Sequence, residues 1–130
     1  MFYGLKNITK IDLSYFNTSL VSDMSGMFSQ CSFLISLNIN NFNTSLVTSM
    51  SSMFSGCSSL ISLNLNNFDT SLVNYTNNMF YNCNSNLIYC INETKAHKIT
   101  SLLSKFKKDC NNSCFVNLNH KLIKEKKKYV

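Results

Sequence analysis

The fold is decided by the stretch from Phe42 to Asn67, which reads FNTSLVTSMSSMFSGCSSLISLNLNN. The preceding residues 16–41 are identical to it at 20 of 26 positions. A third copy begins at Phe68 and keeps the same Phe, Met-Phe and Cys positions, although it has no counterpart of Met50. A fixed period of this length is typical of proteins that stack one structural unit on the next. The sequence therefore predicts a repeat architecture.

The period also extends toward the N-terminus. Met1 and Phe2 fall in register with Met27 and Phe28, so the chain begins partway through a repeat. We expect that a capping unit and a signal peptide can lie upstream of Met1, because a stack of repeats needs a closed outer end.

Each unit divides into two halves with different spacing of apolar residues. Leu63 and Leu65 form a short L-x-L alternation, which predicts a strand. In the other half, Thr44 or Ser45 stands where a helix N-cap belongs, and the apolar residues that follow step at helical spacing: Val47, Met50, Met53, Phe54 and Cys57. The predicted fold class is an α/β solenoid of about four coils, with a parallel sheet on one side, short helices on the other and a C-terminal cap helix.

The repeat stops after Cys90, and a different pattern follows. Apolar residues recur at amphipathic-helix spacing with Thr94 as a possible cap: Ile99, Leu102, Leu103 and Phe106. We therefore divide the chain into a solenoid over residues 1–92, a cap over residues 93–118 and a basic tail over residues 119–130. The tail is most simply a solvated terminus, and contact with nucleic acid or an anionic membrane is the alternative.

Composition and charge restrict the function classes. The chain of 130 residues carries a net charge of +6, yet residues 11–92 contain no lysine at all. We expect no nucleic-acid partner, because such modules spread basic residues over one face or interleave them with aromatics. No apolar run is long enough to span a bilayer, so no transmembrane segment is expected.

Catalysis is not expected. The only histidines, His97 and His120, pair with no nucleophile or carboxylate at a recognisable spacing. Asp12, Asp23 and Asp69 occupy different phases of the repeat, so they do not converge. With three glycines the chain cannot build a phosphate-binding loop, and we expect no catalytic residue, no cofactor and no metal.

The six cysteines fall into two groups. Cys31 and Cys57 occupy one repeat position and are predicted to be buried free thiols. The other four lie near the cap and are disulfide candidates that could form two bridges: Cys83, Cys90, Cys110 and Cys114. Zinc bound by Cys90, Cys110, Cys114 and His120 is the lesser alternative, because no C-x-x-C pair is present.

Six Asn-x-Ser/Thr sequons are candidates for N-glycosylation, a number that barely exceeds what so many Asn, Ser and Thr residues give by chance. They lie at Asn7, Asn17, Asn43, Asn74, Asn92 and Asn111.

A binding surface is expected on the outward side of the predicted sheet, where equivalent side chains line up in columns. The candidate ligand-binding residues are Lys10, Asp12, Ser36, Asn38, Asn40, Ser62, Asn64 and Asn66. Plain solubility explains this polar face equally well. A second candidate is the column of Leu20, Leu46 and Leu72, for which packing in the core is favoured over exposure.

The motif around Phe42, Met53-Phe54 and Gly56-Cys57, followed by Leu60 and Ser62-Leu63-Asn64-Leu65, resembles the BspA-like leucine-rich-repeat surface proteins. This resemblance implies a secreted or cell-surface protein used in adhesion or interaction, with a protein or glycan ligand on a cell surface. Two alternatives remain open: an intracellular repeat scaffold whose basic tail docks on an acidic partner, and a truncated, non-functional copy of the family.

Overall fold

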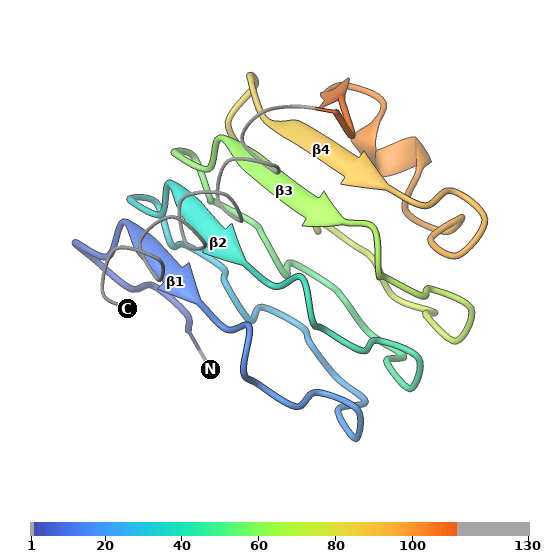
Figure 1. Cartoon of the computed structure of the whole chain (residues 1–130). Helices are drawn as coiled ribbons and strands as arrows, with labels where there is room; N and C mark the ends of the chain where they lie inside the picture. The colour runs from blue at the N-terminus through green and yellow to red at the C-terminus, as the bar shows by residue number, and fades with distance from the viewer. Residues whose placement is uncertain (1, 112–130) are drawn as a thin grey trace, which may run out of the picture.

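The computed structural model describes residues 2–111, which form short parallel strands joined by turns. The strands are β1 (Lys10–Asp12), β2 (Ser36–Asn38), β3 (Ser62–Leu65), β4 (Ile88–Ile91) and β5 (Lys107–Lys108). They make a two-stranded sheet, β1-β2, and a three-stranded sheet, β3-β4-β5. In Figure 1 the arrows of β1 to β4 lie side by side and point the same way.

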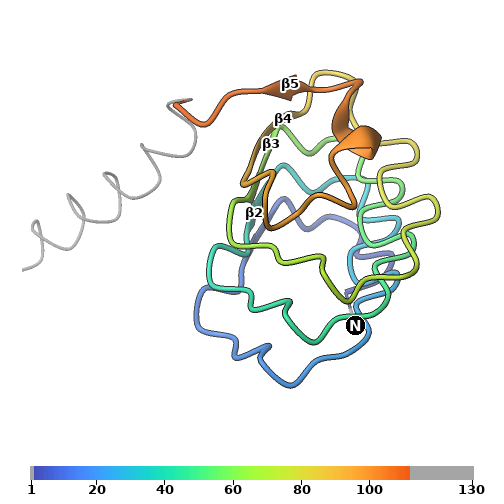
Figure 2. The ribbon, with the colours of Figure 1, turned by 90° about the vertical axis from the view of Figure 1, so that its right-hand side faces the viewer.

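The strands pair at the spacing of the sequence repeat. Lys10 pairs with Ser36 in the first sheet, and Ser62 pairs with Ile88 in the second. Between the two sheets, the Ile61 N–H donates to the Ile35 carbonyl at 3.3 Å. Figure 2 shows the strands on one side of the molecule and the turns on the other. We infer that the successive turns of chain build the solenoid expected from the repeat.

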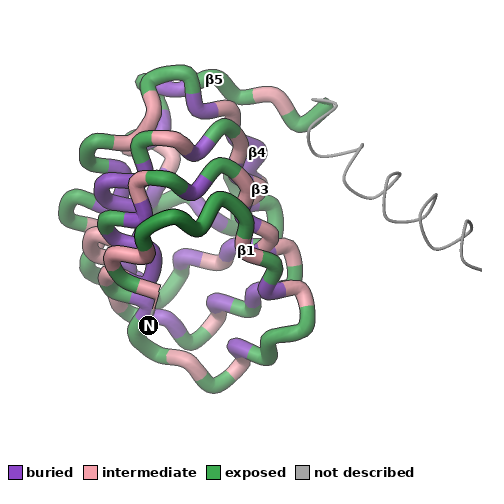
Figure 3. Tube along the Cα trace, turned by 90° about the vertical axis from the view of Figure 1, so that its left-hand side faces the viewer, coloured by how far each residue is buried: buried purple, intermediate pink, exposed green. Residues whose placement is uncertain are grey.

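Phenylalanines spaced one repeat apart stack through the centre of the molecule. The distances between neighbouring ring centroids along the series Phe2, Phe28, Phe54 and Phe80 are 5.6, 5.7 and 5.6 Å. Phe106 continues this column edge-on, 6.1 Å from Phe80. Buried residues therefore recur at equivalent places in successive turns (Figure 3). Each unit completes its core only against its neighbours.

The expected helices opposite the sheet are absent from the described residues, and this half of each unit is a series of turns. The backbone explains the difference, because one position of each unit adopts a positive φ: Gly26 (64°), Ser52 (57°) and Asn78 (57°). A second position four residues later does the same, at Gln30 (62°), Gly56 (77°) and Asn82 (53°). A right-handed helix cannot pass through a left-handed residue, so the apolar spacing is met by turns instead.

The expected N-cap also has another role. The Thr44 Oγ1 donates to the Asp69 carbonyl at 2.8 Å and accepts from the Asp69 N–H at 2.8 Å, so it joins two units rather than capping a helix.

The amphipathic helix predicted in the cap is wrong in length and type, because the described part of the cap, residues 93–111, holds only a three-residue 3-10 helix, η1 (Ser101–Leu103). The apolar residues of the pattern still cover the last unit: Ile99, Leu103 and Phe106 are buried and Leu102 packs against the core. Thr94 does not cap a helix but donates to the Asn92 side chain. The segment follows the path of a repeat because Thr70 binds the Lys95 carbonyl and the Lys98 N–H. No helix of residues 2–111 has the length and apolar character needed to cross a membrane.

Candidate functional site

The polar face predicted from the sequence lies on the outer side of β1, β2 and β3. Leu37 and Leu63 point into the core, and the residues on either side of them are half-buried or exposed, as strand alternation requires. The structure therefore places the candidate residues of these strands in two neighbouring columns. One column holds Lys10, Ser36 and Ser62, and the other holds Asp12, Asn38 and Asn64. In β4 the equivalent places hold Ile88 and Cys90, so the polar face ends at β3.

One column of this face is tied to the backbone. The Oδ1 atoms of Asp12, Asn38 and Asn64 each accept a hydrogen bond from the backbone N–H two residues later, at 2.9, 3.2 and 3.0 Å. Two of the donors are Asn40 and Asn66, which were themselves candidate binding residues. These side chains thus terminate the strands as Asx turns, a structural role that the sequence pattern did not reveal.

Hydrogen bonds of this local kind also lower the pKa of the three aspartates in the repeats, Asp12, Asp23 and Asp69. The Ser14 backbone N–H holds the pKa of Asp12 below its ordinary value. Hydrogen bonds from the Ser25 and Ser71 hydroxyls lower the pKa of Asp23 and Asp69 in the same way. Each carboxylate is thus occupied by its own turn, and the three do not meet at one site.

The free hydrogen-bonding groups of the face belong to the other column. The Ser36 and Ser62 hydroxyls are half-buried, and Lys10 is exposed at the end of the column. A hydroxyl both donates and accepts, whereas the Asn38 side chain is already hydrogen-bonded to the Asp12 carboxylate and contributes to the lowered pKa of Asp12. The arrangement can bind a ligand that offers a row of carbonyl or hydroxyl groups.

The leucine column is exposed, which corrects the preference for core packing. Leu20, Leu46 and Leu72 have exposed fractions of 87%, 46% and 49%. Each stands at the tip of a turn, next to a valine that packs on the core: Val21, Val47 and Val73. The sequence pattern Leu-Val could not show which of the two neighbours faces inward. Lys98 follows one repeat after Leu72 and donates through Nζ to the Ser71 and Val73 carbonyls.

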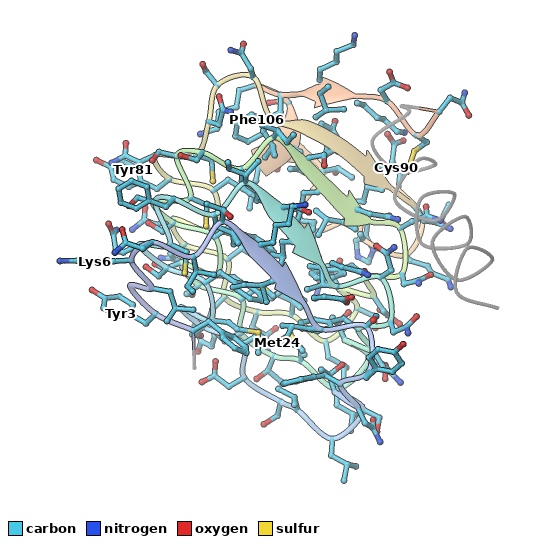
Figure 4. The ribbon with its side chains drawn as sticks, turned by 60° about the vertical axis from the view of Figure 1, so that its left-hand side comes forward. Tyr3, Lys6, Met24, Tyr81, Cys90 and Phe106 are labelled. Carbon is cyan, nitrogen blue, oxygen red and sulfur yellow. A yellow bond between two sulfur atoms is a disulfide. The ribbon has the colours of Figure 1, made fainter. Side chains whose placement is uncertain are left out.

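The cysteines separate as expected in part. Cys90, within β4, and Cys110, the second residue after β5, form a disulfide (Figure 4). Cys31 and Cys57 are buried free thiols, as predicted. Cys83 is also a free thiol, so its assignment as a bridge candidate is wrong. Cys114 and His120 lie outside the described residues.

The three free thiols occupy one repeat position and share one contact. The Sγ atoms of Cys31, Cys57 and Cys83 donate to the carbonyls of Phe2, Phe28 and Phe54 at 2.8, 3.2 and 3.1 Å. Burial raises the pKa of all three thiols, that of Cys83 to about 11. Cys83 therefore makes the same contact with the preceding unit as the other two thiols. In the cap, the carbonyl of the next phenylalanine of the column, Phe80, accepts a hydrogen bond from Lys105 Nζ at 3.4 Å instead of from a thiol.

The remaining candidates are separate from one another. The six sequon asparagines are exposed, apart from Asn92, which is half-buried. The side chains of Asn17, Asn43 and Asn92 accept hydrogen bonds from the backbone two residues later, within their own sequons. His97 is exposed, and residues 2–111 contain no group of His, Cys, Asp and Glu arranged to hold a metal ion.

A column of buried threonines was missed by the sequence analysis. Each threonine hydroxyl donates to a backbone carbonyl of the next unit and accepts from a backbone N–H of that unit. For Thr18 and Thr44 one residue supplies both groups, Asn43 and Asp69 respectively. Thr70 donates to the Lys95 carbonyl and accepts from the Lys98 N–H. The signal was available, because the Thr recurs at the same place in every unit.

Comparison with known proteins identifies one family. A family model described as "Mycoplasma protein of unknown function, DUF285" matches residues 1–116. No curated protein and no solved structure matches the chain. The match covers most of the sequence, so the chain belongs to this family.

Proposed function

We propose that this member of the DUF285 family is a non-catalytic protein of the cell surface that binds a protein or glycan through the outer face of β1, β2 and β3. The observation that carries the proposal is the repetition of hydrogen-bonding side chains along this face: Lys10, Ser36 and Ser62 in one column, Asp12, Asn38 and Asn64 in the next. Equivalent groups on neighbouring strands lie about 4.8 Å apart, a spacing suited to a ligand with regularly placed polar groups.

The disulfide supports a location outside the reducing cytosol. The bond between Cys90 and Cys110 fastens the residues after β5 to β4, and such bonds persist mainly in oxidising compartments. A membrane-impermeant amine reagent should therefore label the chain on intact cells, because exposed lysines such as Lys107 and Lys108 are accessible. Labelling that occurs only after lysis would contradict the surface location.

The binding face can be tested by blocking it. In the double variant Ser36→Arg with Ser62→Arg, two long side chains cover the column without touching the Asx turns beside it. We expect at least about a tenfold loss of signal on an array of glycans and extracellular proteins, since the blocked groups would be the central contacts. The matched control is Ser22→Arg, an exposed serine outside the strands.

Three outcomes separate the possibilities. Loss in the double variant with full binding by the Ser22→Arg control supports the sheet face. Equal binding by the double variant and the unchanged chain excludes this face as the binding surface. If no component of the array binds the unchanged chain, the proposal of an adhesive role fails for these ligand classes.

A further inference from the structure

The first strand has a free edge among the described residues. β1 lies at the end of its sheet and pairs only with β2. The Thr9 carbonyl accepts from the Ile35 and Ser36 N–H groups, and the Leu13 N–H donates to the Asn38 carbonyl. Because the backbone groups of a strand alternate between its two edges, those of Lys10 and Asp12 point away from β2. An edge of this kind can pair with a further strand.

Apolar side chains around this edge are uncovered compared with their equivalents in the next unit. Phe16 is 46% exposed and Phe42 only 2%. Ile8 is 40% exposed, whereas Leu34 is fully buried. Phe2, Leu5, Ile11 and Val21 are only partly buried for the same reason. The open end therefore offers an apolar surface beside a row of free backbone groups.

The opposite end is closed. β5 consists of two exposed lysines, and Lys108 forms a salt bridge of 2.7 Å with Glu93. The disulfide holds this segment to β4, and Phe106 covers the last ring of the phenylalanine column. Lysines on an edge strand discourage further pairing. Within residues 2–111, β1 therefore offers the strand edge that is better suited to pairing, and a second copy of the chain presents the same edge.

The charged residues of β1 are complementary in an antiparallel pair of two copies of this strand. Lys10 and Asp12 point to the same side of the strand and are symmetric about Ile11, whereas the equivalent residues of β2 and β3 are neutral: Ser36, Asn38, Ser62 and Asn64. We propose that two copies of this chain associate head to head through antiparallel pairing of β1 with β1, centred on Ile11. Lys10 of each copy then lies opposite Asp12 of the other.

Backbone geometry and charge select the same register. Residues opposite each other in the hydrogen-bonded positions would be Lys10 and Asp12, whose N–H and carbonyl groups face the free edge. The two other symmetric registers place Lys10 opposite Lys10 or Asp12 opposite Asp12, and like charges directly opposite are destabilising. The same surface patch is used by both copies, as in an isologous dimer with closed symmetry.

Charge reversal tests the pairing. The variants Lys10→Asp and Asp12→Lys each place like charges opposite one another at both ends of the pairing. We expect sedimentation velocity to show a dimer for the unchanged chain. In each single variant charge repulsion should weaken association, with a dimer dissociation constant at least about tenfold higher. The double variant Lys10→Asp with Asp12→Lys restores opposite charges and should return to within about threefold of the original.

The controls make each result decisive. Asn38→Lys adds a charge to the same face on the covered strand β2 and should leave the dimer unchanged. Circular dichroism of every variant checks that the fold is retained, which is expected because Lys10 and Asp12 are exposed. A chain that stays monomeric at all concentrations overturns the proposal and leaves the open end to a further repeat unit. A double variant that dimerises no better than the single variants overturns the register.

Discussion

The buried threonines are the most specific polar contacts between units. Thr44 is 1% exposed, and its hydroxyl satisfies both the N–H and the carbonyl of Asp69. Thr44→Val keeps the shape of the side chain but leaves these groups without partners. We expect the free energy of unfolding to fall by about 1–3 kcal/mol, measured by denaturant unfolding.

The control for this prediction is Thr48→Val. Thr48 is exposed, and its hydroxyl donates only to the Ser22 carbonyl at 3.2 Å. This change should stay within about 0.5 kcal/mol, because water replaces the lost contact. An equal loss in both variants would show that burial of the threonine hydroxyl is unimportant.

The free thiols should be unreactive in the folded protein. A thiol with a pKa of about 11, as in Cys83, is about 0.1% thiolate at pH 8, and the thiolate is the reactive form. In a Cys114→Ser variant, we expect slow reaction with a chromogenic disulfide reagent before unfolding and fast reaction afterwards. Rapid reaction of the folded protein at pH 8 would contradict the burial.

The same thiols make stability depend on alkaline pH. Their pKa is higher in the folded state than in the unfolded state, so the stabilisation is complete below the unfolded value of 9.0. It is lost progressively above that value, because the unfolded thiols ionise first. The free energy of unfolding should therefore decline between pH 9.0 and about 11 for Cys83, and a Cys83→Ala variant should decline less.

At the scale of elements, the cap is fastened by the disulfide. Cys90 and Cys110 are 20 residues apart, and cross-linking a loop of this length stabilises by about 3 kcal/mol in the chain-entropy model. Cys110→Ser should lower the melting temperature. It should also increase amide hydrogen exchange mainly over residues 92–111, whereas exchange in β2 stays slow. A uniform increase over all units would contradict a local role.

Strands and helices differed in how well the sequence predicted them. The Leu63 and Leu65 alternation gave β3 correctly, since alternation specifies one buried face directly. The spacing of Met50, Met53 and Phe54 also occurs in consecutive turns, and here the positive φ of Ser52 excludes a helix. Serine gives no sign of a left-handed backbone, and the signal came only from its alignment with Gly26.

For the whole molecule, neighbouring units determine stability. Phe54 is packed between Phe28 and Phe80, whereas Phe2 has Phe28 on one side and only a tilted contact with Phe16 on the other. Phe54→Ala should cost about 3–5 kcal/mol, and Phe2→Ala clearly less. Chemical denaturation in dilute solution measures both. Equal losses would mean that the units do not stabilise one another in pairs.

The repeat register was the most predictable property of the molecule, because side chains one period apart must occupy equivalent environments. The paired residues of β1 and β2 and the phenylalanine column follow it. The outward position of Ser36 and Asn38 on either side of the buried Leu37 follows from strand alternation, but the Asx turns of Asp12, Asn38 and Asn64 depend on local backbone geometry. The orientation of Leu20 was unpredictable, because two adjacent apolar residues compete for one inward position.

The phenylalanine column has a consequence for the evolution of this gene. The three stacked contacts from Phe2 to Phe80 have nearly the same separation, so the junctions between these units are interchangeable. A recombination event that inserts or deletes one whole unit leaves each remaining junction intact and needs no compensating mutation. Lineages can therefore vary the reach of the protein in discrete steps while both ends keep their chemistry.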